Sequence, residues 1–284
     1  MSISYIGGKA SIAKPLIIPN IPTDIETFVE IFGGMYWVFF KMNLSDYPNL
    51  KTVVYNDFNR LNSNLFKCLN DHKTLLEECL KLPTQQKGVY PTPYICKETF
   101  NKIKSEIYNK DFVLLDEPDY RIAASYAYVL TQVFSGLHPE KANFIDLKGK
   151  YHSKFTSFIN KLNSPKWQEM YERIDFVENM DFEDVINKYD SKNTFFYADP
   201  PYHKTENYYS SHDFTESTHM RLSRILNNIE GRFSLSYYDF PELSQMFPKE
   251  KFKWVSKEFF KPSMARSGKS QSKGEELLIM NYEL

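Results

Sequence analysis

The chain has 284 residues, of which 42% are hydrophobic and 25% are charged, and its formal net charge is −1. These values are typical of a soluble protein with one large domain, or one domain with a sizeable insertion, and they exclude a strongly basic coat protein of nucleic acid. The apolar stretch 28–40 is too short to cross a bilayer, and cysteines without CxxC spacing favour reduced thiols. We therefore expect a cytoplasmic protein with no membrane span.

The first predicted elements form a βαβ unit of the kind that binds nucleotides. Residues 27–32 predict a strand, Gly33-Gly34 a tight turn and residues 35–42 a helix. Residues 51–55 predict a second strand that ends at Asp57. This acid follows the glycines by about one βαβ step, the spacing at which such folds hydrogen-bond a ribose. The alternative is an ordinary core strand and turn followed by a surface aspartate.

The next stretch of the chain is longer than a doubly wound sheet requires. It predicts an inserted, mainly helical domain over residues 69–165, flanked by an α/β domain made of residues 1–68 and 166–284. Helical patterning covers residues 75–82, 98–108 and 120–134, and irregular sequence follows. The irregular part carries Lys141, Lys148, Lys150 and Lys154. We expect it to face a phosphate backbone, the alternative being a solvated lysine-rich loop.

The α/β pattern resumes with strands predicted at residues 174–177 and 194–198. The second strand ends in the tetrapeptide Asp199-Pro200-Pro201-Tyr202. The prolines end the ladder and stiffen the turn, so the carboxylate and the ring are held at the carboxyl edge of a sheet, where α/β proteins bind ligands. The aspartate and the first proline carbonyl can accept hydrogen bonds from an exocyclic amine while Tyr202 stacks on a flat heterocycle. A plain strand-to-loop exit is the alternative.

The carboxyl-terminal part completes the predicted sheet. Residues 219–229 predict a helix and residues 232–237 a strand, and residues 252–260 and 276–282 predict an antiparallel hairpin at the sheet edge. The connection between the hairpin strands is rich in serine, glycine and basic residues, including Arg266 and Lys269. It is the strongest local basic feature of the chain and a second candidate phosphate contact.

These segments together resemble the Dam-like (alpha-group) family of DNA adenine-N6 methyltransferases. Residues 5–9 are similar to the (W/Y)xGGK segment of the family, residues 30–34 to its EPFxG cofactor loop and residues 179–182 to its short acidic–aromatic segment. The resemblance implies a Rossmann-like methyltransferase sheet that uses S-adenosyl-L-methionine. The implied cofactor-binding residues are Tyr5, Gly8, Lys9, Phe32, Gly33, Gly34, Asp57, Asp181 and Phe182.

The resemblance also covers the recognition and catalytic segments. Residues 134–137 are similar to the FNGL stretch of the target-recognition domain, and the tetrapeptide at 199–202 is the DPPY catalytic motif. The implied catalytic residues are Asp199, Pro200, Pro201 and Tyr202. The candidate DNA-binding residues are Leu137, His138, Lys141, Lys148, Lys150, Arg266 and Lys269.

Some positions depart from the family pattern. Tyr36 stands where the cofactor loop usually has its last glycine, and we expect its bulk near the methionine end of the cofactor. Ile31 replaces the proline of that loop, and Ser135 replaces the asparagine of FNGL. For Lys9 the alternative is a surface lysine at a helix start, and for Asp181 it is a helix cap.

The activity implied is sequence-specific methyl transfer to the N6 amine of an adenine flipped out of double-stranded DNA. The chemistry requires no metal and the sequence suggests none. A cognate restriction endonuclease acting separately is a possible partner, in a bacterium or a virus-infected host cell. The alternatives are an RNA adenine-N6 methyltransferase and a catalytically inert DNA-binding homologue.

Overall fold

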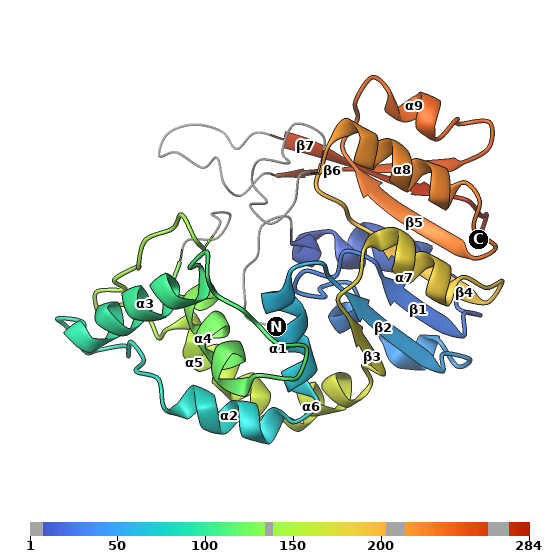
Figure 1. Ribbon diagram of the computed structural model, residues 1–284. Coiled ribbons are helices and arrows are strands. Elements are labelled where there is room, and N and C mark those ends of the chain that lie inside the picture. Colours follow the sequence, from blue (N-terminus) through green and yellow to red (C-terminus); the bar gives the residue numbers. More distant parts are fainter. Residues whose placement is uncertain (1–7, 134–138, 203–213, 261–272) are drawn as a thin grey trace. The chain divides into compact units, whose positions relative to one another are not determined.

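The computed structural model describes residues 8–133, 139–202, 214–260 and 273–284, and the chain divides into two compact units. One unit is helical and comprises residues 59–177 together with Gly8, and the other is an α/β unit of residues 9–58 and 178–284 (Figure 1). Within the described ranges, no helix is long and apolar enough to cross a membrane.

In the described part of the chain, seven strands form one sheet in the order β3-β2-β1-β4-β5-β7-β6. The pairs β1–β2, β1–β4 and β4–β5 are parallel, whereas β7 runs antiparallel to both β5 and β6. The predicted α/β fold with an antiparallel edge hairpin is therefore confirmed. The strands are β1 (Thr27–Glu30), β2 (Thr52–Asn56), β3 (Phe176–Glu178), β4 (Thr194–Ala198), β5 (Arg232–Tyr237), β6 (Lys253–Phe260) and β7 (Lys273–Met280).

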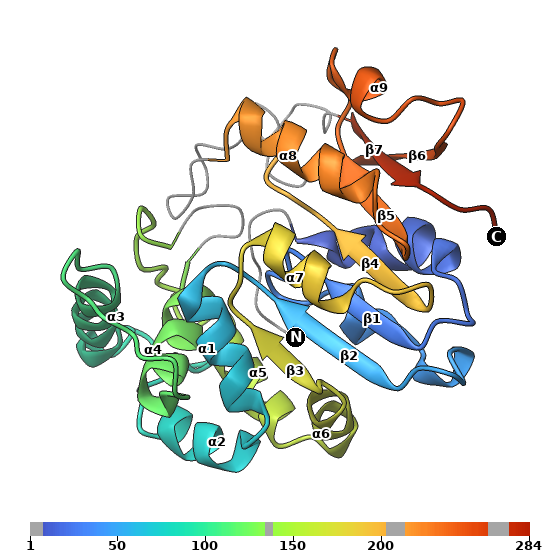
Figure 2. The same ribbon diagram turned by 45° about the vertical axis from the view of Figure 1, so that its right-hand side comes forward.

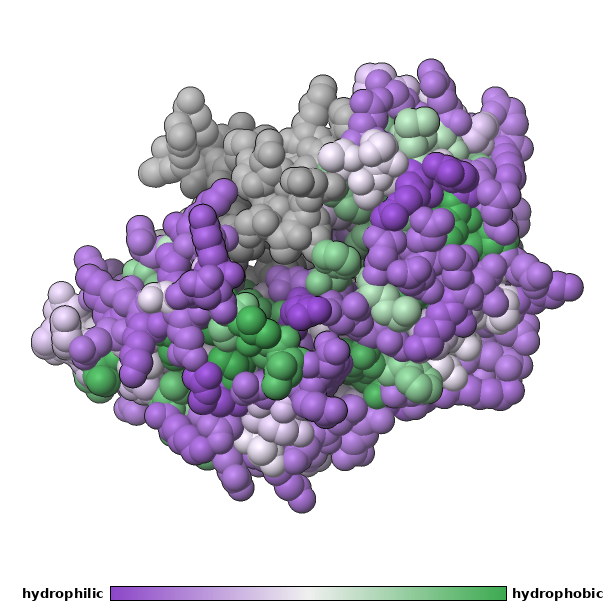
Figure 3. All heavy atoms as spheres, in the orientation of Figure 1, coloured by the Kyte–Doolittle hydropathy of each residue, from purple (hydrophilic) through white to green (hydrophobic). Residues whose placement is uncertain are grey.

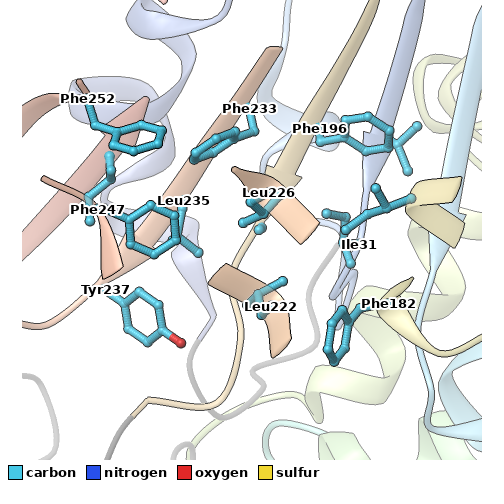
Figure 4. Close-up of a cluster of buried hydrophobic side chains, with 14 of the residues drawn as sticks. Ile31, Phe182, Phe196, Leu222, Leu226, Phe233, Leu235, Tyr237, Phe247 and Phe252 are labelled. Carbon is cyan, nitrogen blue, oxygen red and sulfur yellow. The ribbon is translucent and has the colours of Figure 1, made fainter. Parts of the chain in front are cut away.

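One face of this sheet is covered by α7 (Phe182–Tyr189) and α8 (Glu216–Leu226), as Figure 2 shows. Alternate strand residues turn to that face, so Val29, Phe196 and Leu235 join apolar side chains of both helices in one buried cluster (Figure 4). Hydrophilic residues predominate over the α7 and α8 side of the α/β unit in Figure 3. The two helices are thus amphipathic and seal the sheet from solvent.

The opposite face is covered by the amino-terminal turns η1 (Lys9–Ser11), η2 (Ala13–Ile17) and η3 (Ile18–Asn20), with η4 (Phe39–Lys41) and η5 (Leu44–Asp46) following β1. Here Phe28 of β1 stacks on Phe195 of β4, with ring centroids 5.9 Å apart. Because the parallel strands are buried on both faces, β4 is an unbroken apolar run, as its sequence indicated.

The helix predicted over residues 35–42 is wrong, because only the short 3₁₀ turn η4 forms there. Tyr36 has a φ of 55°, a left-handed conformation that interrupts a right-handed helix. The carboxylate of Glu30 accepts a hydrogen bond from the Phe39 backbone N–H at 2.8 Å and fixes the chain in the turn. The ring of Tyr36 is fully buried on Phe39, and its hydroxyl donates to the Val54 carbonyl at 3.0 Å.

The helical unit contains α1 (Arg60–Leu69), α2 (His72–Leu80), α3 (Tyr94–Ile107), α4 (Tyr120–Thr131), α5 (Lys154–Leu162) and α6 (Pro165–Glu172). The predicted helical segments correspond to α2, α3 and α4, whereas α1, α5 and α6 were not predicted. A buried polar chain joins the loops to α4, because Gln85 donates to Gln132 at 2.8 Å and Gln132 donates to Ser153 at 3.0 Å. All three cysteines are buried and free.

We expect Tyr36→Ala to lower the free energy of unfolding by about 3–5 kcal/mol, because it removes a fully buried aromatic ring and leaves a cavity. The measurement is urea unfolding followed by circular dichroism. Trp37→Ala is the matched control, since this neighbouring ring is only partly buried, and it should cost less. Equal losses in the two variants would contradict the structural role of Tyr36.

Candidate active site

The site is built where the parallel strands end. Since β1, β2 and β4 run parallel, the residues that follow them meet at one edge of the sheet. This brings together the Gly33-Gly34 turn after β1, Asp57 after β2 and Asp199 after β4. The antiparallel strand β7 enters the sheet at the same edge, because Leu277 pairs with Tyr237 at the end of β5. Glu276, one residue earlier in β7, therefore also lies at this edge.

Asp199 belongs to a buried cluster of charged and polar groups. The ammonium of Lys9 lies 2.9 Å from Oδ1 of Asp199 and 3.1 Å from Oε1 of Glu276. The Tyr202 hydroxyl contacts Lys9 and donates a hydrogen bond to Glu276. The side chains of Lys9 and Glu276 are 7% and 1% exposed and that of Asp199 is 17% exposed, so these charges are shielded from water and interact strongly.

Burial and mutual repulsion change the ionisation of this cluster. Burial raises the pKa of Asp199 to about 6, with Lys9 opposing the change and Glu276 adding to it. Burial lowers the pKa of Lys9, but the two carboxylates outweigh it, so the ammonium titrates above its usual range. Glu30 is fully buried nearby, and desolvation raises its pKa well above the ordinary value. At neutral pH the cluster therefore holds a charged lysine and an ionised Asp199.

Tyr202 is buried rather than projecting from the turn. Its ring packs edge-on against Tyr238, with centroids 4.4 Å apart, and lies near Tyr237 at 5.7 Å. The Lys9 ammonium lies 4.5 Å from the centroid of the same ring, a distance at which cation–π attraction acts. Lys9 is therefore buried, and the alternative interpretation of Lys9 as a surface lysine is wrong.

The glycine turn and Asp57 form one interlocked loop. The Asp57 carboxylate accepts a hydrogen bond from the Gly34 backbone N–H at 2.8 Å. Gly34 has a φ of 50°, a conformation that glycine adopts without strain. A Cβ on Gly33 would lie 2.4 Å from the Tyr55 ring, so a side chain has no room there. The structure thus joins the predicted loop to the predicted acid.

A pair of asparagines, which sequence reasoning missed, ties the segment after β3 to the end of β2. Asn56 accepts a hydrogen bond from the Met180 N–H at 2.9 Å, and its amide donates to Ile31 at 2.8 Å and Met180 at 3.2 Å. The amide of Asn179 donates to the carbonyl of Asp57 at 2.7 Å. These bonds place the acidic–aromatic segment beside Asp57.

Asp181 caps α7, the alternative that its sequence context left open. Its carboxylate accepts a hydrogen bond from the Glu183 N–H at 2.9 Å and pairs with Arg221 at 2.6 Å. Arg221 also lies over the ring of the buried Phe182, 4.3 Å from its centroid. The Phe182 and Phe32 ring centroids are 5.9 Å apart, so two predicted cofactor-binding residues are neighbours.

Among the predicted DNA-binding residues, Lys141, Lys148 and Lys150 are exposed on the helical unit. The irregular segment predicted there is present, and α5 begins at Lys154. The irregular segment packs against the loop before α3, since the Gly88 N–H donates to the Gly149 carbonyl at 2.8 Å. Gly8 is exposed. The remaining predicted site residues, Tyr5, Leu137, His138, Arg266 and Lys269, lie outside the described residues.

Residues 87–94 and 146–152 form what we term the paired-loop surface. Besides the glycine contact, the Lys87 N–H donates to His152 at 3.4 Å and Thr92 hydrogen-bonds Asp146. This surface displays Tyr90, Tyr94 and Tyr151, which are 63%, 77% and 68% exposed, beside Lys87, Lys148 and Lys150.

The carboxylates of the buried cluster also raise the question of metal binding. In the portion of the chain that the structure describes, no group of three or more histidine, cysteine, aspartate or glutamate side chains is arranged to hold a metal ion. The ammonium of Lys9, rather than a cation from solution, lies between the carboxylates of Asp199 and Glu276.

In open α/β sheets of this kind, ligands generally bind beyond the carboxyl ends of the parallel strands, which is where Asp57 and Asp199 lie. A family model described as D12 class N6 adenine-specific DNA methyltransferase matches residues 5–261. The chain therefore belongs to the D12 class of N6 adenine-specific DNA methyltransferases, and it is an enzyme that methylates adenine in DNA. No individual curated protein matches the sequence at a significant level.

Glu276 is the member of the buried cluster that could not be identified from the sequence. The signal was present, because an acid precedes the apolar run Leu277-Leu278-Ile279-Met280 within one predicted strand. A charged side chain in such a strand is buried only if it has a partner. The partner, Lys9, lies more than 260 residues away in the sequence, so no local pattern could identify it.

We expect Lys9→Met to destabilise the protein by about 3–5 kcal/mol at pH 8, because two buried carboxylates lose their only shared cation among the described residues. Without Lys9 the folded-state pKa of Asp199 rises further above its unfolded value. The penalty is therefore absent below the unfolded pKa, grows as the pH rises from the unfolded to the folded pKa, and is fully present above the folded pKa. Urea unfolding at pH 5 and pH 8 measures it.

The control for this experiment is Lys14→Met, which changes an exposed lysine of the same segment and should cost less than about 0.5 kcal/mol at either pH. A small loss in Lys9→Met, independent of pH, would show that the ammonium does not hold the cluster.

Proposed function

We propose that this enzyme transfers a methyl group from S-adenosyl-L-methionine to the N6 amine of an adenine flipped out of double-stranded DNA, with Asp199 as the main acceptor for that amine. The observation that carries the proposal is the position of the Asp199 carboxylate, which a buried lysine holds at the carboxyl edge of the sheet. The chain that carries it belongs to the adenine methyltransferase family. Its target is the adenine that the family acts on.

The adenine amine is a poor nucleophile, because its lone pair is delocalised into the ring. Hydrogen bonds from N6 to Asp199 and to the Pro200 carbonyl draw that lone pair toward the methyl carbon, and they act as fixed dipoles where positive charge develops. When the N6–carbon bond forms, the sulfur–carbon bond breaks and N6 gives up a proton. Asp199, with a pKa of about 6, is a suitable acceptor for that proton at neutral pH.

The residues at the strand ends fit S-adenosyl-L-methionine by their chemistry. A carboxylate after β2, fixed by the Gly34 N–H, suits the two hydroxyls of a ribose. The aromatic pair Phe32 and Phe182, supported by the stacked Arg221, offers apolar surface for an adenine ring. The cofactor supplies an activated methyl on a sulfonium, so alignment with N6 is the main task left to the protein.

We propose that Tyr36 adds no bulk to this site, in contrast to the expectation from the sequence. Its ring is fully buried in the aromatic core and its hydroxyl binds Val54 of β2. Its backbone has a φ of 55°, in the left-handed region that glycine adopts readily, and its ring fills the core. On this proposal the departure from the FxGxG pattern is compatible with cofactor binding.

The target base must leave the duplex, because its amine is inaccessible inside the helix. Stacking of Tyr202 on the flipped adenine requires the ring to turn out of its position against Tyr237 and Tyr238. Because that movement costs energy, we propose that the Tyr202 ring turns only when the adenine enters the site and replaces the lost contacts. Tyr202 is thus proposed to change partners, from Glu276 and Lys9 to the base.

Duplex contacts are proposed for the paired-loop surface of the helical unit. Exposed lysines neutralise phosphates without reading sequence, and exposed tyrosines can stack on bases or pack on sugars. Lys148 and Lys150 meet the first requirement, and Tyr90 and Tyr151 meet the second. Lys141, Arg266 and Lys269 remain proposed phosphate contacts on the basis of their sequence.

We predict that Asp199→Ala lowers the rate of methyl transfer at least 10²-fold, since a preorganised polar group at a reacting centre is worth about that factor. The assay follows labelled methyl groups into unmethylated DNA. Cofactor binding, measured by calorimetry, should survive the change. Near-normal turnover would contradict the proposed role of Asp199.

Asp57→Ala is the opposite control. It removes the proposed ribose acceptor, so it should weaken binding of S-adenosyl-L-methionine about tenfold or more. Asp239→Ala alters an exposed acid of the same unit and should change neither quantity. Unchanged binding in Asp57→Ala would argue against this site for the cofactor.

Replacing Lys148 and Lys150 together with alanine should weaken DNA binding about equally for all sequences. The slope of log affinity against log salt should become shallower by about 2, because two phosphate contacts are lost. Fluorescence anisotropy across a salt series measures both effects. Lys73→Ala combined with Lys102→Ala removes two exposed lysines of the same unit and serves as the control. A slope that stays at the wild-type value would exclude these phosphate contacts.

A further inference from the structure

We propose that Glu276 is a positioning residue for methyl transfer. It shares the Lys9 ammonium with Asp199 and so keeps Asp199 available to the adenine amine. The proposal rests on the proposed role of Asp199. It concerns a residue of β7, in a part of the chain beyond the matched residues 5–261.

The geometry shows a shared cation rather than a simple ion pair. The Lys9 Nζ lies at nearly equal distances from the two carboxylates, 2.9 Å from Asp199 and 3.1 Å from Glu276. Glu276 is fixed in this position by the pairing of β7 with β5 on one side and β6 on the other. With two carboxylates and one ammonium, the buried group carries a net charge of −1 when Asp199 and Glu276 are ionised.

This sharing has a consequence for substrate binding. If Lys9 faced Asp199 alone, a complete buried ion pair would compete with the adenine amine for the same carboxylate. Glu276 draws part of the ammonium's attraction to itself, so Asp199 retains acceptor capacity for a further donor. Glu276 also accepts a hydrogen bond from the Tyr202 hydroxyl in the arrangement without a base.

The titratable and charged groups around Asp199 come from several elements. Lys9 of η1 lowers the Asp199 pKa, whereas Glu276 of β7 raises it, and Tyr202 lowers it by hydrogen bonding. Tyr197 of β4, Glu30 of β1 and Tyr238, which follows β5, also interact electrostatically with this carboxylate, whose negative charge raises the pKa of each of them. Removal of the charge at position 276 therefore has a predictable direction, because it removes a group that raises the Asp199 pKa.

The test is the pH dependence of kcat/KM for methyl transfer, which reports ionisation of the free enzyme. In the wild-type enzyme the acid limb should lie at about pH 6, where Asp199 takes up a proton. Glu276→Gln keeps the side-chain volume and an oxygen acceptor but removes the charge. We expect its acid limb to move to lower pH, and its kcat/KM at pH 8 to fall about tenfold because Lys9 then pairs fully with Asp199.

The adjacent exposed acid provides the matched control, since Glu275→Gln should leave both the limb and the rate unchanged. An acid limb in Glu276→Gln at the wild-type position would overturn the proposal, because a purely structural role would lower activity without moving the limb. If Asp199→Asn retains substantial turnover, the proposed function itself fails. If Asp199 is essential and the limb does not move, only the role of Glu276 fails.

A second pair of variants serves if Glu276→Gln does not fold. Lys9→Met should move the acid limb to higher pH, and adding Glu276→Gln to it should move the limb back toward the wild-type value. The double variant removes a buried positive and a buried negative charge together, a change that proteins tolerate better than loss of one partner. The same limb in Lys9→Met and in the double variant would also overturn the proposal.

Discussion

The ammonium of Lys9 lies between two buried carboxylates, and the arrangement of the proposed active site depends on that interaction. Burying two like charges at one sheet edge is unfavourable unless a cation is enclosed with them. The three charged groups come from the amino-terminal turn, the end of β4 and the start of β7, so forming the cluster requires the sheet to be complete. Asp199 consequently adopts its position only in the folded α/β unit.

The aromatic core supports this edge from both faces of the sheet. On one face, α7 and α8 pack over Val29, Phe196 and Leu235. Phe182 is the first residue of α7 and belongs to the same cluster, so this packing also fixes its position. On the other face, Tyr36 and Phe39 fill the space behind the glycine turn. The packing of these side chains therefore supports the strand ends at which Asp57 and Asp199 lie.

The sequence was sufficient to predict the strands, because β4 is a nearly continuous apolar run, β5 alternates polar and apolar residues, and Asp199-Pro200 marks where pairing ends. It failed at residues 35–42, where a left-handed Tyr36 and a tertiary hydrogen bond from the Phe39 N–H to the Glu30 carboxylate override local helical preference. It also failed at Glu276 and Asn56, whose partners are distant in the chain. Motifs could name Asp199 and Asp57, but only the fold could show which charges surround them.

We propose that methyl transfer from S-adenosyl-L-methionine to adenine N6 takes place at the carboxyl edge of this sheet. The most direct measurement incubates the protein with labelled cofactor and unmethylated genomic DNA, then maps modified bases by position. We expect N6-methyladenine confined to one short sequence. Methylation at another atom or base, or cofactor binding without any transfer to DNA, would contradict it.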